Sequence, residues 1–400
     1  MQRIIIVYFD AGGGHRAAAR ALAESIRQQG RPWHVTALNL DDVLESVDPI
    51  HRATGLRGGE IYNRALRMGW TAGSAQVLPV MHGVIRMLHP KQVRLLQDCW
   101  RRLEPDLVLS VVPHYNRALF ESLRAESRHT PFVTMMTDLA DYPPHFWFER
   151  QDQDFICGSE HARQQARALG IGSSRLWNVS GMVLHPRFYE PIQEDRTAER
   201  RRLGLHPSLP AGLVLFGGYG SQSMVEIARR VAETPRRIQL LFLCGRNQEL
   251  LWRLRRLDLP FPAHVEGFTE DVARYMWLSD FFIGKPGPGS VSEALAMRLP
   301  VIVQAGPRTL AQERYNVEWI RQQGVGIPVS SVRAIPRAVD ELLRPAVRRR
   351  MLRNIGRLNN RAVFEVPEIL DRILSADIIS SKTLLPRDVS SNFDTHDIAV

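Results

Sequence analysis

The sequence predicts an α/β protein in which two similar halves, each built on a parallel sheet, hold a ligand between them. Short apolar runs alternate with helical segments along the whole chain, a pattern typical of parallel strands joined by crossover helices. Glycine-rich turns follow three of these runs, one near the start of the chain and two in its second half. At 400 residues, the chain is also long for one domain and suits two.

The apolar runs that predict strands are residues 4–9, 34–39, 107–112, 132–137, 155–157, 213–216, 239–244, 265–267, 281–283 and 301–304. The first of them, within RIIIVYF, is β-branched and aromatic throughout, as expected for a strand buried on both faces. The pattern restarts with a Pro-flanked, charged helix near residues 195–203. We therefore expect an N-terminal domain at 1–189, a C-terminal domain at 190–375 and a weakly ordered polar tail at 376–400.

Basic residues outnumber acidic ones by 52 to 42, and the formal net charge of +10 favours anionic ligands and surfaces. Lys stands only at positions 91, 285 and 382, so nearly all of the positive charge is Arg. The basic residues are not interleaved with stacking aromatics as in a nucleic-acid-binding module, so we expect no nucleic-acid partner. The segment 51–102 combines basic residues with Trp and Met, which suits an amphipathic region on an anionic membrane. A helical insertion packed on its own domain fits that segment equally well.

The cysteines have no metal-binding or redox spacing, which predicts small buried apolar side chains in a reducing compartment: Cys99, Cys157 and Cys244. No apolar run approaches about 18 residues, so no segment is expected to span a bilayer. The chain begins directly with a strand rather than with a signal peptide. We therefore expect a cytoplasmic protein.

The first glycine-rich turn, DAGGGH, places Gly12, Gly13 and Gly14 directly before His15. The glycines allow another molecule to approach the backbone. The histidine stands at the carboxyl end of a strand, where open α/β sheets bind their ligands. A plain tight turn is the alternative for this segment taken alone.

The turn that begins at Gly284, GKPGPGSVSEALAMRLP, is the most informative stretch of the chain. Ser290 and Glu293 have capping-box spacing, so we expect a helix to begin at Ser290. A strand, a glycine-rich loop and a helix N-terminus together predict a phosphate site, because unpaired N–H groups and the helix dipole point to the same place. No Gly-Lys-Ser/Thr follows the glycines, which excludes a Walker loop. A similar turn, GGYGS, follows the strand at 213–216.

On these residues, the chain resembles the diacylglycerol glycosyltransferases of glycosyltransferase family 28, which include the plant-type monogalactosyldiacylglycerol synthases. The resemblance covers residues 3–365, and six motifs carry it in order. They are GGGHRA at 12–17, VTMMTDL at 133–139 followed by His145 and Trp147-Phe148, GMVLHP at 181–186, GGYGS at 217–221, KPGPG at 285–289 with Glu293, and Gln312-Glu313 with Asn316.

The resemblance implies a GT-B fold, in which two Rossmann-like domains face a cleft and the second holds most of a UDP-sugar. It also implies inversion at the anomeric carbon with neither a metal ion nor a cofactor. The sequence agrees in having no Asp-x-Asp after a strand. Backbone N–H groups, helix dipoles and basic side chains then have to meet the charge of the diphosphate.

The resemblance further implies which residues bind the donor. The two loops of the second half would cradle the diphosphate: Gly217, Gly218, Gly220, Ser221, Gly287, Gly289 and Ser290. Glu293 would bind the ribose hydroxyls, and the turn at Phe268 would stack on the uracil. Gln312, Glu313 and Asn316 would hydrogen-bond the sugar. For Glu293, a role as the capping partner of Ser290 alone is the alternative.

His15 is the first candidate for the general base, because a neutral imidazole suits removal of a proton from the acceptor hydroxyl near pH 7. Asp138 is the second candidate, either as the base itself or as the group that orients His15. The alternatives are that His15 only binds phosphate or acceptor and that Asp138 is a cap. His145 and His185 are weaker candidates.

The resemblance thus implies a hexosyltransferase that acts on a lipid, with diacylglycerol as the expected acceptor, as a peripheral protein at the inner face of the cell membrane. Three alternatives stay open: transfer of N-acetylglucosamine to a polyprenyl-linked acceptor, a UDP-sugar 2-epimerase of the same fold, and a donor-binding subunit without activity. An intact His15 counts against the last. The chain departs from the plant-type pattern at DYPPH, residues 141–145, and at Arg308, which leaves the sugar and the acceptor open.

Overall fold

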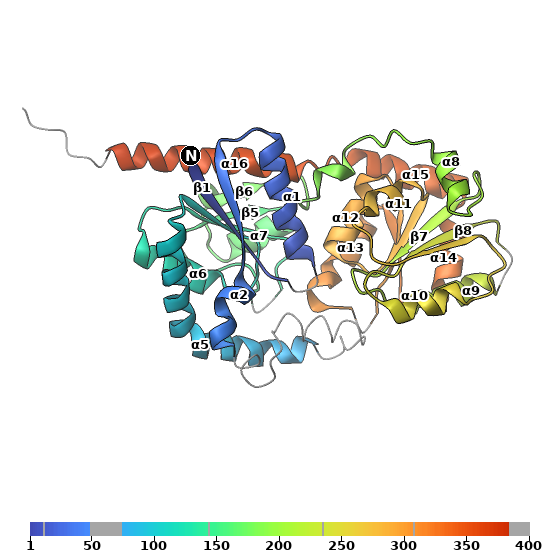
Figure 1. Cartoon of the computed structure of the whole chain (residues 1–400), viewed down its shortest axis with the longest axis horizontal. Coiled ribbons are helices and arrows are strands. Elements are labelled where there is room, and N and C mark those ends of the chain that lie inside the picture. Colours follow the sequence, from blue (N-terminus) through green and yellow to red (C-terminus); the bar gives the residue numbers. More distant parts are fainter. Residues whose placement is uncertain (11–12, 49–73, 143–144, 234–235, 307–308, 384–400) are drawn as a thin grey trace, which may run out of the picture.

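The computed structural model describes residues 1–10, 13–48, 74–142, 145–233, 236–306 and 309–383. Two lobes lie side by side, each centred on a six-stranded sheet in which every pair of neighbours is parallel (Figure 1). The first sheet contains β1 (Gln2–Tyr8), β2 (Trp33–Asn39), β3 (Leu107–Ser110), β4 (Phe132–Met135), β5 (Asp154–Cys157) and β6 (Leu176–Asn178). The second contains β7 (Ala211–Leu215), β8 (Gln239–Leu243), β9 (Ala263–Glu266), β10 (Phe281–Gly284), β11 (Val301–Gln304) and β12 (Gly326–Val329). The predicted α/β class with two parallel sheets is confirmed.

All of the predicted strands are present, and two further strands, β6 and β12, were not predicted. Both missed strands lie at a sheet edge. β6 is only three residues long, and β12 contains Pro328, which removes a ladder N–H and is tolerated at an edge. Neither run carries enough apolar pattern to predict a strand from sequence.

Helices cover both faces of each sheet. In the first lobe they are α1 (Gly14–Gln28), α2 (Leu40–Leu44), α5 (Ser74–Leu103), α6 (Asn116–Glu126), α7 (Glu160–Ala168) and α16 (Ala362–Thr383). In the second they are α8 (Arg196–Arg202), α9 (Ser223–Ala232), α10 (Gln248–Arg255), α11 (Val272–Trp277), α12 (Pro288–Ala296), α13 (Arg314–Gln323), α14 (Ile335–Leu342) and α15 (Pro345–Arg357). In β1, Ile4 and Ile6 pack against α1 and α16 on one face of the sheet, whereas Ile5 and Val7 pack against α2, α5 and α6 on the other. This strand is therefore buried on both sides, as predicted. The three cysteines are also buried, as predicted.

The strand order predicts a ligand site at one switch point in each sheet. The first sheet runs β2-β1-β3-β4-β5-β6 and the second β12-β11-β10-β7-β8-β9, so the direction of winding changes between β1 and β3 and between β7 and β10. Ligands of open parallel sheets bind outside the carboxyl ends of the strands at such a switch point. The two carboxyl edges face each other, because His161 in the first turn of α7 stacks on Tyr315 in the first turn of α13 with ring centroids 4.2 Å apart.

α16 corrects the predicted domain boundary. Residues up to 375 were assigned to the second domain, but α16 lies against α1 and packs Val366 and Leu370 into the core of the first (Figure 1). The Ser25 hydroxyl donates to the Val363 carbonyl at 2.8 Å, which fixes the helix on α1. α16 is apolar along this face and is buried only by returning to the first sheet. It also continues through residues 376–383, which were predicted as tail; residues 384–400 lie outside the described part.

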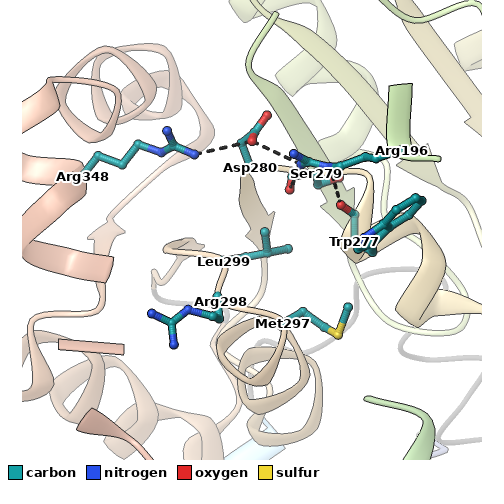
Figure 2. A pocket seen from close by; sticks show the side chains of 8 residues that line it. All are labelled: Arg196, Trp277, Ser279, Asp280, Met297, Arg298, Leu299 and Arg348. Carbon is teal, nitrogen blue, oxygen red and sulfur yellow. Dashed lines mark hydrogen bonds and ion pairs between the residues drawn. The ribbon is translucent and has the colours of Figure 1, made fainter. Parts of the chain in front are cut away.

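A network of arginines around Asp280 holds the opposite, amino edge of the second sheet together. Asp280 directly precedes β10 and accepts a hydrogen bond of 2.8 Å from the N–H of Ala211, the first residue of β7. Arg196 and Arg348 reach the same carboxylate from two sides of a cavity of about 260 Å³ (Figure 2). Arg200, only 3% exposed, donates to it at 2.8 Å. Burial alone would raise the pKa of Asp280, but the Ala211 N–H and the arginines outweigh it and hold the pKa below its usual range.

We expect Asp280→Ala to lower the free energy of unfolding by about 3–5 kcal/mol, because it leaves the buried Arg200 charge without its partner. Since the pKa of Asp280 is lowered in the folded state, its stabilisation is present at neutral pH and is lost as the pH falls through the folded pKa. Denaturant unfolding should therefore show a gap between wild type and variant that narrows in acid. Asp152→Ala, which breaks an exposed pair with Arg175, is the control and should cost no more than about 1 kcal/mol. An equal loss in both variants would contradict the assignment.

Candidate active site

His15 lies in the first turn of α1, at the switch point of the first sheet. The turn depends on Gly13, whose φ of 83° is a left-handed conformation that glycine adopts without strain. The His15 Nδ1 lies 2.8 Å from the Val111 carbonyl oxygen and 3.1 Å from the Thr137 hydroxyl. A carbonyl only accepts, so Nδ1 carries the proton and Nε2 keeps its lone pair. Gly14 opens the helix, and the predicted Gly12 lies outside the described residues.

The environment of His15 keeps its ring neutral. Burial lowers the pKa of His15 to about 4, against the smaller opposite effect of the Val111 bond. Among the residues that the structure describes, none is hydrogen-bonded to Nε2. His15 therefore offers a bare imidazole nitrogen at neutral pH, as a general base requires.

Asp138 follows β4 and is 9% exposed. Its Oδ2 accepts a hydrogen bond of 3.0 Å from Trp147 Nε1. Burial raises the pKa of Asp138 to about 7; the Trp147 bond and Lys285 oppose that rise, and Glu313 and Asp141 add to it. Val111 and Thr137, not Asp138, make the bonds to His15 Nδ1, so Asp138 does not orient His15 through that nitrogen.

The two weaker histidine candidates are engaged elsewhere. His145 Nδ1 lies 3.3 Å from Asp141, a carboxylate that also accepts the N–H groups of Phe146 and Trp147. His185 accepts a hydrogen bond from the backbone N–H of Arg187. Both have local structural partners, and neither is bonded to His15.

The loop after β7 is shaped by its glycines. Gly217 and Gly220 have φ angles of 76° and 60°. A Cβ on Gly220 would lie 2.9 Å from the Cys244 carbonyl oxygen, so only glycine fits there. Gly218 accepts a hydrogen bond of 2.9 Å from the Arg246 N–H, which ties this loop to the next one. Ser221 accepts from the N–H of Ser223 at the start of α9.

The loop after β10 ends differently from the prediction. α12 begins at Pro288 with Gly287 as its N-cap, and no side chain caps it, so the expected start at Ser290 with a capping box is wrong. Proline is favoured at the first helical position because its φ is already helical and it has no N–H to leave unpaired. Gly289 and Ser290 consequently lie in the first turn, where backbone N–H groups have no partner within the helix.

Glu293 therefore has no capping bond, which was the alternative to its predicted role in binding the donor. No described residue donates a hydrogen bond to its carboxylate, and burial raises its pKa to about 7. Glu293 is half-buried, and a carboxylate without a donor that a ligand can still reach is suited to accept from the ligand's hydroxyls.

Lys285 lies between the two glycine loops. Its Cε would be 3.7 Å from a Cβ on Gly217 and 3.5 Å from a Cβ on Gly287. Its Nζ pairs with Glu313 at 2.8 Å, and Glu313 is only 6% exposed. Asn316 is fully buried, and its Nδ2 donates to the Pro286 carbonyl at 2.7 Å, while its Oδ1 has no hydrogen-bond partner among the described residues.

Phe268 and Gln312 complete the predicted donor residues. Phe268 follows β9 and is 51% exposed, with the Arg246 guanidinium 4.7 Å from its ring centroid. It therefore presents a flat aromatic surface beside the loop after β7. Gln312 is half-buried next to Glu313.

A short chain of contacts joins the two sides of the crevice. The rings of His15 and Trp147 are 6.0 Å apart, and Trp147 donates to Asp138. Asp138 is in turn close enough to Lys285 and Glu313 for both to shift its pKa. The candidate base of the first domain and the glycine loops of the second therefore line the same crevice.

The chain is 28% identical over 367 residues to the chloroplastic monogalactosyldiacylglycerol synthase 1 of Arabidopsis thaliana, and the match covers 86% of the chain and 65% of that protein. The chain is similar in sequence to the monogalactosyldiacylglycerol synthases. The predicted resemblance is thus confirmed. No family model matches the chain.

Two solved structures show that the chain has the predicted GT-B fold. MurG of Acinetobacter baumannii superposes with a TM-score of 0.59 at 13% identity, over 92% of the chain and 99% of that protein. MnaA of S. aureus, solved with UDP, gives 0.60 at 13% identity, over 98% and 100%.

Two groups near His15 could not be identified from the sequence. The Val111 carbonyl fixes the tautomer of His15, but a backbone group leaves no trace in the residue type. His114, two residues after Val112, has a φ of 70° and adjoins the same loop. Only its unusual place between Pro113 and Tyr115 at the end of a strand hinted at it.

Proposed function

We propose that the chain is an inverting glycosyltransferase that moves a hexose from a UDP-sugar to a lipid acceptor, with diacylglycerol as the expected acceptor. One observation carries the proposal: His15 contacts Trp147, Trp147 donates to Asp138, and Asp138 is close to Lys285, which lies between the two glycine loops. The relative's name, which describes synthesis of monogalactosyldiacylglycerol, supports the lipid, and the UDP in the MnaA structure supports the donor.

The second domain has a group for each part of a UDP-sugar. Unpaired N–H groups of Gly289 and Ser290 and the ammonium of Lys285 suit the diphosphate. The Glu293 carboxylate suits the ribose hydroxyls, and the exposed ring of Phe268 suits the uracil. No metal ion or cofactor enters this proposal, because these groups supply the charge and the donors.

The proposed step is a single displacement. The acceptor oxygen attacks the anomeric carbon, the bond from that carbon to the β-phosphate oxygen breaks, and the acceptor proton moves to His15 Nε2. UDP departs with the bonding electrons, and Lys285 with the loop N–H groups stabilises the charge that develops on it. One displacement from the opposite side inverts the anomeric carbon.

The outer face of α5 supports a lipid acceptor. Val80 and Met87 are 68% and 71% exposed and lie two turns apart on one side of the helix. Exposed basic residues flank them: Arg86, Lys91 and Arg94. No acidic residue occurs from position 79 to 97. We call Val80, Arg86, Met87, Lys91 and Arg94 the α5 stripe.

An apolar and basic stripe of this kind suits the interface of an anionic membrane, with the apolar groups inserted and the basic groups at the phosphates. No helix of the described chain is long and apolar enough to cross a bilayer. We therefore propose peripheral attachment through α5 at the cytoplasmic face of the membrane. Residues 51–73, the remainder of the basic segment predicted from sequence, lie outside the described residues, as does Arg308.

The proposal predicts transfer of labelled sugar from at least one of a panel of UDP-sugars to diacylglycerol in anionic liposomes without divalent metal. His15→Ala should lower transfer by about 10²-fold or more, because the acceptor then has no base. His34→Ala, at an exposed histidine on β2, is the matched control and should keep wild-type transfer. UDP binding without transfer from any donor would sink the diacylglycerol proposal. Polyprenyl-linked acceptors and a 2-epimerase assay would then be tested.

The pH dependence of kcat/KM should distinguish the two candidate bases. A base acts unprotonated, so His15, with a pKa of about 4, predicts a rate that stays level from neutral pH down to about pH 5. Asp138, with a pKa raised to about 7, predicts instead a rate that falls as the pH drops below 7. We expect the first profile, both in wild type and in Asp138→Asn. An acidic limb near pH 7 that disappears in Asp138→Asn would assign the base to Asp138.

The α5 stripe predicts that Met87→Glu weakens binding to vesicles of anionic lipid by about tenfold or more, since it replaces an inserted apolar group with a repelled charge. Vesicle co-sedimentation measures this. Met87→Leu, which keeps the apolar group, should bind like wild type, and added salt should weaken both. Unchanged sedimentation of Met87→Glu would place the lipid-binding surface elsewhere.

A further inference from the structure

His114 and His82 form a hydrogen-bonded pair next to the proposed site. His114 Nδ1 lies 2.8 Å from His82 Nε2, and the two rings meet edge to face with centroids 4.8 Å apart. His114 follows β3, whereas His82 lies on α5. The pair therefore joins the helix that bears the α5 stripe to the carboxyl edge of the first sheet.

The backbone of His114 is held in a conformation that a side chain disfavours. Its φ is 70°, in the left-handed region that non-glycine residues rarely adopt. Its N–H donates to the Phe146 carbonyl at 2.6 Å, and its ring packs on Phe146 with centroids 4.2 Å apart. Together with the bond to His82, these contacts offset the cost of the left-handed backbone.

The same loop carries the carbonyl that sets the tautomer of His15. Val111 accepts from His15 Nδ1, and only Val112 and Pro113 separate it from His114. Asn116 braces the loop by donating to the carbonyls of Val112 and Trp147 at 3.1 and 3.2 Å. A change of backbone at His114 is therefore transmitted directly to the group that orients His15.

Both histidines of the pair are neutral at physiological pH. Burial lowers the pKa of His114 to about 3, with smaller contributions from His82 and His15. Burial and then Arg86 lower the pKa of His82. The N–H···N bond needs one proton between the two rings, so the pair is intact when both are neutral.

We propose that His114 is a positioning residue for His15 and that His82 of α5 holds it in place. The inference rests on the proposed function, because His15 is its base. Without the pair, the loop relaxes toward negative φ and the Val111 carbonyl moves. His15 Nδ1 then keeps only the Thr137 hydroxyl, which can donate as well as accept and so does not fix the proton on Nδ1. The donor loops belong to the other domain, so donor affinity is unaffected.

Four variants separate the hydrogen bond from the strain. His114→Asn keeps a polar nitrogen near the position of Nδ1 and tolerates the left-handed backbone, whereas His114→Gly relieves the strain but removes the ring. His82→Gln keeps a group near the position of Nε2, and His82→Leu removes it. The pair of substitutions at His82 tests the proposal from α5 even if His114→Gly folds poorly.

The measurements are kcat, the KM for the UDP-sugar, the Kd for UDP, and the tautomer of His15 from its ¹⁵N imidazole signals. We expect His114→Gly and His82→Leu to lower kcat by about 10- to 100-fold with KM and Kd unchanged, since a small misplacement of a reacting group costs that much. Their His15 signals should change from the Nδ1–H form to a mixture of tautomers. His114→Asn and His82→Gln should stay close to wild type in both readouts.

Wild-type kcat in His114→Gly and His82→Leu would overturn the proposal. So would a loss in His114→Asn as large as in His114→Gly, or an unchanged His15 tautomer in the impaired variants. If the wild type transfers no sugar at all, the function proposed for the chain fails, but the tautomer of His15 still tests whether the pair positions it.

Discussion

The carboxyl ends of parallel strands all lie along the same edge of a sheet. This constraint determines where the groups of the proposed site lie. Each sheet has one point where the winding direction changes, and the loops that follow the strands on either side of it diverge, which favours a ligand site there. His15 follows β1 and Asp138 follows β4, while Lys285 follows β10. Because the carboxyl edges of the two sheets face each other, a small ligand between them contacts residues that are distant in sequence.

Burial and charge work together in this crevice. Asp138, Glu293 and Glu313 would all repel a diphosphate if they were fully ionised. Burial raises the pKa values of Asp138 and Glu293 to about 7, so both retain part of their protons at neutral pH. Glu313 is paired with Lys285, and the positive charge of Lys285 offsets the negative charge of Glu313. Both effects lower the negative charge that the proposed diphosphate would meet.

Most of the fold was predictable because it follows from the alternation of apolar runs and helical segments in the sequence. Central strands such as β1 and β10 are continuous apolar runs, and the glycine turns mark where the chain reverses. Edge strands β6 and β12 lack that signal. The start of α12 was misplaced because Ser290 and Glu293 have capping spacing while Pro288 and Gly287 make the actual cap. The complete burial of Asn316 and its bond to the Pro286 carbonyl were also not predicted, because tertiary packing decides them.

The return of α16 to the first lobe also governs how the crevice can open. The chain crosses between the lobes twice, and the two crossings are bonded to each other: the Ser180 N–H and hydroxyl donate to Glu365 at 2.7 Å, and Asn360 donates to the Met182 carbonyl at 2.9 Å. A Cβ on Gly181 would lie 2.7 Å from the Asn360 side chain, so a larger residue there would displace the Asn360 amide that bonds Met182. Two crossings joined in this way act as one hinge. A rotation about it changes the distance between His15 and the donor loops while each sheet, with its own loops, stays intact.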